Sequence, residues 1–113
     1  MQQTEQLKGN LQTIILKLLA DHGKMYGYEI TAKVRELSGG EIVLTEGALY
    51  PSLHKLEAEG YLKTETIPLG KRIRKYYMLT ETGKSTVKGR INEFLDFITI
   101  MSRVLRIEPK IIS

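Results

Sequence analysis

The segment 45–62, TEGALYPSLHKLEAEGYL, constrains the fold more than any other part of this chain. Thr45 carries a hydroxyl of the kind that caps the free amides at a helix N-terminus. Gly60 favours the left-handed conformation that often ends a helix. Between them, three leucines recur at helical spacing and share one face: Leu49, Leu53 and Leu56. The segment therefore predicts a short helix whose leucine face is buried.

The other face of this predicted helix carries small and polar residues, namely Gly47, Tyr50, Ser52, His54 and Lys55. Such groups can contact phosphates and the edges of bases. His54 fits either a phosphate or base contact or a solvated position. Pro51 stands inside the helix, where its ring crowds the carbonyl of Gly47. We expect this face to be offered to a partner.

Composition limits the range of functions. The chain has 113 residues, 42% of them hydrophobic and 27% charged, which suits one small globular domain. It lacks cysteine, so disulfides, thiolate chemistry and zinc fingers are excluded. No apolar run is long enough to cross a bilayer and no secretory leader is visible, so we expect a cytoplasmic protein without a membrane partner. The net charge of +4 mildly favours polyanionic partners.

The residues before this segment predict two helices. After a polar, frayed stretch at 1–6, a first amphipathic helix is expected from Leu7 to His22, with Gly9 inside it. A turn at 23–27 leads to a second helix over 28–38, with Ile30, Val34 and Leu37 facing inward. Residues 41–44 favour one short strand. Two helices followed by a polar-faced third helix are typical of a helix-turn-helix domain.

The pattern changes after Gly60 to the alternation typical of strands. Residues 61–67 and 73–79 predict a hairpin with a turn at 68–72. A hairpin after a recognition helix is called a wing, and this one carries four cations: Lys71, Arg72, Arg74 and Lys75. Such a cluster repels itself unless an anion lies nearby, so we expect phosphate contacts. The alternative is a solvated basic loop that protects a strand edge from pairing.

A long final helix is expected after Thr80 and is closed by Glu108 and Pro109. Apolar residues form a heptad seam along it, at Val87, Ile91, Phe94, Ile98, Met101 and Leu105. A second stripe contains Phe97, Ile100 and Val104, and Leu95 lies between the two stripes. The small preceding domain cannot cover both, so we predict a homodimer through this helix, assisted by the first. The alternative is a helix that folds back to complete a monomeric core.

No catalytic, cofactor or metal site is expected. His22 lies at a helix end, where capping explains it better than metal binding. No two carboxylates face a substrate position, and the glycines at 39–40 and 70 form no phosphate-binding motif. We therefore do not expect an enzyme.

The chain resembles the PadR-like transcriptional regulators from about Leu7 to Val104. The most specific residues are Leu49-Tyr50-Pro51, Leu53, Leu56-Glu57 and Gly60-Tyr61-Leu62, followed by basic residues, Tyr76-Tyr77, Leu79-Thr80 and Gly83. The single C-terminal helix resembles that of the small subfamily. The resemblance implies a mainly α fold with a small β-hairpin wing: a winged helix-turn-helix domain over 1–79, and a dimerisation helix and tail over 80–113.

The same resemblance implies a regulator, expected to be a repressor, that binds a pseudo-palindromic double-stranded DNA operator as a homodimer. Residues matching the recognition-helix surface of the family are Thr45, Gly47, Tyr50, Pro51, Ser52 and Lys55. Residues matching its wing are Lys71, Arg72, Arg74 and Lys75. Some small members bind flat aromatic drugs between two tryptophans, and this chain has none.

Two alternatives remain open. The dimer helices could enclose a hydrophobic small-molecule effector, with Phe94 and Phe97 lining a small pocket or serving as plain dimer core. The chain could also be a winged-helix module that binds protein in place of DNA. The basic wing argues against this module, because a protein adaptor has no need of such a cluster.

Overall fold

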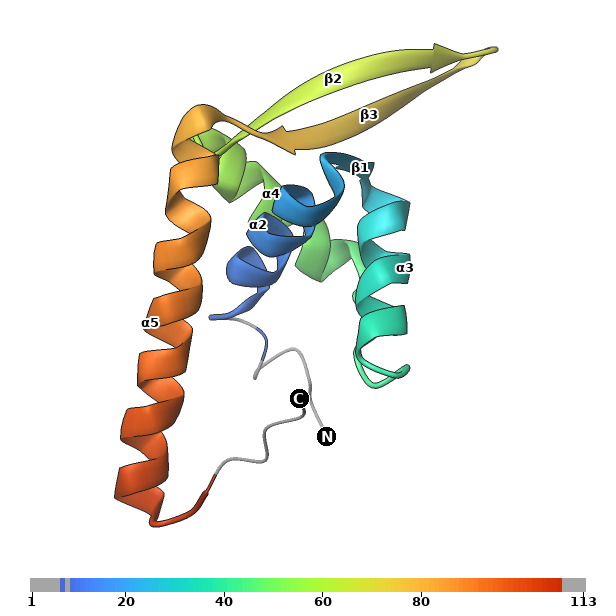
Figure 1. Ribbon diagram of the computed structural model, residues 1–113. Coiled ribbons are helices and arrows are strands. Elements are labelled where there is room, and N and C mark those ends of the chain that lie inside the picture. Colours follow the sequence, from blue (N-terminus) through green and yellow to red (C-terminus); the bar gives the residue numbers. More distant parts are fainter. Residues whose placement is uncertain (1–6, 8, 109–113) are drawn as a thin grey trace.

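Helices lie beneath a small antiparallel sheet, and the long C-terminal helix runs down one side of them (Figure 1). The computed structural model describes Leu7 and residues 9–108. The elements are α2 (Leu11–His22), β1 (Lys24–Tyr26), α3 (Gly27–Leu37), α4 (Glu46–Ala58), β2 (Leu62–Leu69), β3 (Arg72–Leu79) and α5 (Glu81–Leu105). This arrangement confirms the expected winged helix-turn-helix with a long C-terminal helix. None of the described helices is long and apolar enough to span a membrane.

One hydrophobic core joins the helices to the sheet. It is formed by the leucine face of α4, the apolar face of α2, and residues from α3, the sheet and the start of α5. Its fully enclosed side chains are Ile15, Leu16, Leu19, Ile30, Leu49, Leu53, Leu56 and Tyr77. Each large apolar side chain removed from water stabilises the fold by about 1.5–3 kcal/mol as an upper estimate. The core therefore fixes which side of α4 faces outward.

The sheet has three strands in the order β1-β3-β2, all antiparallel. Leu69 pairs with Arg72, so only Gly70 and Lys71 form the tip of the wing. Gly70 adopts a φ of 61°, which residues other than glycine rarely adopt. The expected turn at 68–72 was too long, because Pro68 still pairs with Ile73 inside the ribbon.

Strand β1 occupies the place where a simple turn was expected at 23–27, so that expectation was wrong. Its register pairs Tyr26 with Tyr76, at the base of the wing. A three-residue strand is too short to show a period of two in the sequence. The strand expected at 41–44 is absent: these residues are irregular, and the buried Leu44 anchors them to the core.

Two helix predictions also need correction. Helix α2 begins at Leu11, because Gly9 and Asn10 form a turn that precedes the helix. Leu37 was expected to face inward, yet it is 69% exposed. It lies in the last turn of α3 and borders an apolar groove between α2 and α3. The stretch 1–6 that was expected to be frayed lies outside the described residues.

The end of α5 also differs from expectation. The helix stops at Leu105, because Arg106 takes a left-handed conformation with φ 58° and ψ 47°. The amide of Ile107 then donates to the carbonyl of Ser102 at 3.0 Å. Pro109, which was expected to close the helix, lies outside the described residues.

A single threonine connects the end of α4 to the start of α5. The hydroxyl of Thr80 donates to the carbonyl of Gly60 at 2.6 Å and accepts from the amide of Gly83 at 3.0 Å. A β-carbon on Gly83 would collide with the carbonyl oxygen of Tyr61. The two segments are therefore held in close contact where the wing begins.

Candidate nucleic-acid interface

Helix α4 begins as its sequence indicates. The side chain of Thr45 accepts a hydrogen bond from the amide of Ala48 at 3.2 Å. The helix ends near Gly60, whose φ of 84° is left-handed. Because the leucine face is buried, the residues on the opposite side are exposed: Gly47, Pro51, His54 and Lys55. Pro51 follows Gly47 by about one turn, and His54 and Lys55 follow Pro51 by about one more, so the four form one row along the helix.

Tyr50 and Ser52 lie at the edges of this row and are half-buried. The hydroxyl of Tyr50 reaches the N-terminus of α3, where it lies against Gly27. Its ring centroid is 6.4 Å from that of His54. Tyr50 was expected to point outward, but the structure places it between α3 and α4. The tyrosine thus contributes to the angle between the two helices of the helix-turn-helix.

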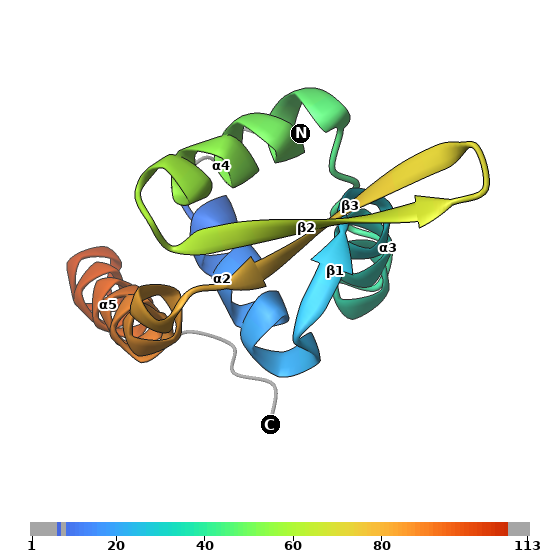
Figure 2. The same cartoon turned by 90° about the horizontal axis from the view of Figure 1, so that it is seen from above.

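The wing projects beyond the helices. Figure 2 shows the hairpin crossing between α4 and β1 and reaching past α3. Lys71, at the tip, and Arg72 are exposed. Lys75 is also exposed, and its amine lies 5.4 Å from the centre of the Tyr77 ring. Three of the four predicted wing cations are therefore open to a partner.

Arg74 differs from these three cations because it is half-buried. Its guanidinium lies 4.0 Å from the centre of the Tyr26 ring. A hydrogen bond to Tyr76 raises the pKa of Arg74 above its ordinary value.

A groove of about 350 Å³ lies between α4 and the wing. It is bordered on one side by Tyr26 of β1, Gly27 of α3 and Tyr50 of α4, and on the other by residues 72–75 of the wing. Neither Tyr26 nor Gly27 was predicted from the sequence as part of this surface. The sequence feature that could have identified them is a glycine between two tyrosines, directly before a helical pattern. A glycine at the start of a helix is compatible with close packing there.

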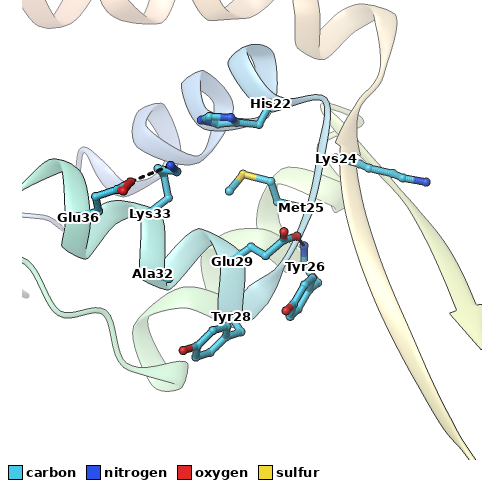
Figure 3. Close-up of a pocket in the computed structure, with 9 residues that line it drawn as sticks. All are labelled: His22, Lys24, Met25, Tyr26, Tyr28, Glu29, Ala32, Lys33 and Glu36. Carbon is cyan, nitrogen blue, oxygen red and sulfur yellow. Dashed lines mark hydrogen bonds and ion pairs between the residues drawn. The ribbon is translucent and has the colours of Figure 1, made fainter. Parts of the chain in front are cut away.

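A second pocket, shown in Figure 3, lies between the end of α2, β1 and the outer side of α3. Met25 faces it, whereas Lys24 points away. Glu29 accepts from the backbone amide of Tyr26 at 3.1 Å, and Lys33 pairs with Glu36 at 2.8 Å. Its carboxylates are thus engaged within the protein, and no group of three or more potential metal ligands occurs among the described residues.

The apolar seam on α5 divides into two parts. Val87 is only 8% exposed and Ile91 packs on the core, so the protein's own domain already covers this end. Val87 therefore offers little surface to a second chain, and its predicted place in a dimer interface stays a prediction. Further along, large apolar side chains are exposed: Phe94, Leu95, Phe97, Ile100, Met101, Val104 and Leu105, with Ile98 half-buried.

Comparisons with known proteins agree with this geometry. The model of the transcriptional regulator PadR-like family matches residues 15–89. A transcriptional regulator from Clostridium thermocellum has a similar structure, with a TM-score of 0.79 and 30% identity over 88% of this chain and 93% of that one. Bacillus subtilis PadR in complex with operator DNA gives a TM-score of 0.64 and 33% identity over 72% of this chain and 45% of that one.

A curated relative is the negative transcriptional regulator PadR of Bacillus subtilis. It is 36% identical over 75 residues, which are 66% of this chain and 41% of that protein. This chain therefore matches less than half of that relative.

Proposed function

The chain belongs to the PadR-like family of transcriptional regulators, and from this premise we propose that it represses transcription by binding a pseudo-palindromic operator as a homodimer. As a family member it is a DNA-binding regulator and not an enzyme. The single observation that supports the proposal best is the outward row on α4, beside a basic wing.

Helix α4 would enter the major groove. The row of Gly47, Pro51, His54 and Lys55 is exposed because the leucines opposite it are buried. A glycine and a proline leave room for close approach of the helix to the duplex. The imidazole of His54 and the amine of Lys55 can donate to acceptors on base edges or phosphates. Thr45 and Ser52 would contact the backbone from the edges of this face.

The wing would supply phosphate contacts from Lys71, Arg72 and Lys75. These side chains are exposed on a ribbon that extends past α3. Phosphate neutralisation releases counterions, so binding would weaken steeply as salt rises. Tyr50 would act mainly by holding α4 against α3.

Dimerisation would use the distal part of α5. Phe94, Ile98, Met101 and Leu105 continue the seam beyond the point where α2 covers it. Each such side chain is worth about 1.5–3 kcal/mol when fully buried. Four from each of two chains can offset the cost of association, about 4–15 kcal/mol. The chain would thus have two parts: residues 1–79 would bind DNA in the cytoplasm, and residues 80–113 would pair the chains.

A repressive role is supported by the Bacillus subtilis relative, which is named as a negative transcriptional regulator. Repression requires only that the dimer occupy DNA that the polymerase must use. The two-fold axis of the dimer predicts half-sites about 34–36 Å apart, or a multiple of that distance.

Selection of bound duplexes from a random pool tests the proposal. We expect an enriched pseudo-palindrome, with two-fold symmetric footprints on it. Lys55→Ala should reduce affinity for the selected site, whereas Lys88→Ala, at an exposed position on α5, should leave it unchanged. Recovery of no common motif, together with equal binding of all sequences, would contradict the proposal.

A second candidate function is regulation by a hydrophobic small molecule. The observation that favours it is an apolar groove of about 600 Å³, bordered by Ile14, Leu18, Val34, Leu37, Ile42 and Ile91. The groove adjoins α5, so a ligand there would lie beside the dimer helices. An effector must bind one arrangement of the dimer better than the other. Thermal-shift screening should find apolar compounds that raise Tm, and Leu37→Lys, at an exposed position on the border of the groove, should abolish that rise.

A further inference from the structure

Arg74 stands apart from the other wing cations in what it contacts. Side chains alternate across a strand, and Tyr77 and Leu79 face the core. Arg74 and Tyr76 therefore lie on the opposite face of the sheet, together with Arg72. Arg74 is half-buried on this face, whereas Arg72, one pair nearer the tip, is exposed.

Arg74 hydrogen-bonds Tyr76 of its own strand and also contacts β1, the strand at the base of the wing. Its guanidinium covers the Tyr26 ring at 4.0 Å, and Tyr26 meets Tyr76 edge-on with ring centroids 5.5 Å apart. The ring of Tyr76 also lies 5.4 Å from the amine of Lys24. An arginine placed over a tyrosine face is attracted to the negative ring face. Arg74 thus ties β3 to β1 where the two strands part.

Tyr26 is itself fixed. Its backbone amide donates to Glu29 at 3.1 Å, which closes the first turn of α3 (Figure 3). The negative charge of Glu29 also helps to raise the pKa of Arg74. Beyond Tyr76 the wing has no partner on the β1 side among the described strands, because β1 pairs only with residues 76–78. The Arg74–Tyr26 contact is therefore the last cross-link before the ribbon projects freely.

We infer that Arg74 is a positioning residue: it holds the wing at a fixed angle to α3 and α4, and it does not bind phosphate. This inference rests on the proposed DNA binding, since the angle matters only if the wing and α4 reach one duplex together. Arg72 and Lys71 then make the phosphate contacts. Replacing Arg74 loosens the wing, and affinity falls because ordering the wing must accompany binding.

The test compares Arg74→Gln with Arg72→Gln, two identical changes on one face of one strand. Affinity for a selected operator is measured from low to high salt. Arg72→Gln should reduce the slope of log Kd against log salt by about 0.9. Arg74→Gln should weaken binding about tenfold at every salt concentration and leave the slope unchanged. An equal loss of slope in both variants would overturn the inference.

Conservative variants separate positioning from charge. Lysine keeps the charge but loses the planar stacking group. Arg74→Lys should therefore behave like Arg74→Gln, whereas Arg72→Lys should behave like the parent protein. Tyr26→Leu should weaken binding, and adding Arg74→Gln to it should cause no further loss. Tyr26→Phe keeps the ring and should bind normally. Restoration of affinity by Arg74→Lys would overturn the inference.

A measurement without DNA distinguishes this inference from the proposed function. Hydrogen exchange of the backbone amides at 72–75 should accelerate in Arg74→Gln and stay unchanged in Arg72→Gln. If the parent protein binds no duplex but this difference in exchange is seen, the proposed function fails and the positioning role stands. If the parent binds DNA and the two variants exchange alike, the positioning role is wrong.

Discussion

The hydroxyl of Tyr50 lies so close to Gly27 that a β-carbon there would collide with it. An ideal β-carbon built on Gly27 would lie 3.0 Å from Cζ of the Tyr50 ring and still closer to its hydroxyl. The first residue of α3 is thus in direct contact with the helix that faces outward. This contact leaves no room for a side chain at Gly27 while the Tyr50 ring keeps its place.

Gly27→Ala should therefore destabilise the fold. The new methyl group must displace the Tyr50 ring, and overpacking of this kind costs about 1–3 kcal/mol. Adding Tyr50→Phe, which removes the colliding hydroxyl, should recover part of the loss. Urea unfolding measures both effects. Gly89→Ala is the matched control: it lies in a helix with nothing within 4 Å of the new methyl group, so it should stabilise by about 0.5–1 kcal/mol.

Gly83→Ala should be more damaging than Gly27→Ala. Its β-carbon would meet the backbone carbonyl of Tyr61, which cannot rotate away as a side chain can. We expect a loss on the order of 3 kcal/mol, measured by urea unfolding, with no second-site relief from Tyr61→Ala. Full rescue by Tyr61→Ala would show that the side chain, and not the backbone, causes the conflict.

The exposed cations of the wing should contribute to DNA affinity regardless of the base sequence. The double variant Lys71→Ala/Arg72→Ala should weaken binding to a selected operator and to random duplex by similar factors. Its salt slope should fall by about 2, because each of the two cations would neutralise one phosphate and release about one counterion. Filter binding or fluorescence anisotropy at several salt concentrations checks this. Unchanged affinity would remove the wing from the interface.

The distal seam of α5 should control association. Phe94→Asp/Met101→Asp places charges on the exposed apolar stripe and should give monomers by sedimentation, with weaker operator binding. The helix-turn-helix core should remain folded, because its own residues are untouched. Asp96→Lys lies on the other side of the helix and should stay dimeric. A parent protein that sediments as a single chain would refute dimerisation through this helix.

Alkaline pH should destabilise the protein through Tyr77. Burial, with the neighbouring Tyr50 and Glu57, raises the pKa of this phenol above its ordinary value of 10.0. The neutral form is favoured in the fold, so the stabilisation is complete below about pH 10 and is lost as pH rises through the raised pKa. Tyr77→Phe should unfold less steeply with pH above about 10 in urea titrations. Tyr28→Phe, at an exposed tyrosine, is the control.

Long periodic segments were predicted well from the sequence. The leucine spacing of α4 and the cap at Thr45 are local properties, so the helix and its buried face follow from them. Alternation after Gly60 likewise indicated the wing. The exposed positions Pro51 and Lys55 then follow as the opposite side of a helix whose inward side is known.

The misses at β1, residues 41–44, Arg74 and Tyr50 depend on partners distant in the sequence. Strand β1 forms because its residues pair with the edge of β3, and no local sequence pattern indicates this pairing. Residues 41–44 have a strand-like pattern but no partner. Arg74 looks like its neighbours in a basic run, and only the ring of Tyr26 sets it apart. Tyr50 looked like a surface residue because the sequence does not show how closely Gly27 approaches it.

The hydroxyl of Thr80 couples the orientation of α5 to that of α4. It donates a hydrogen bond to the carbonyl of Gly60, just after α4, and accepts one from the amide of Gly83 in the first turn of α5. The long helix cannot pivot at its root without breaking one of those two bonds. A twist of α5 would therefore move the C-terminal end of α4, and in the proposed dimer it would change the distance between the two α4 helices.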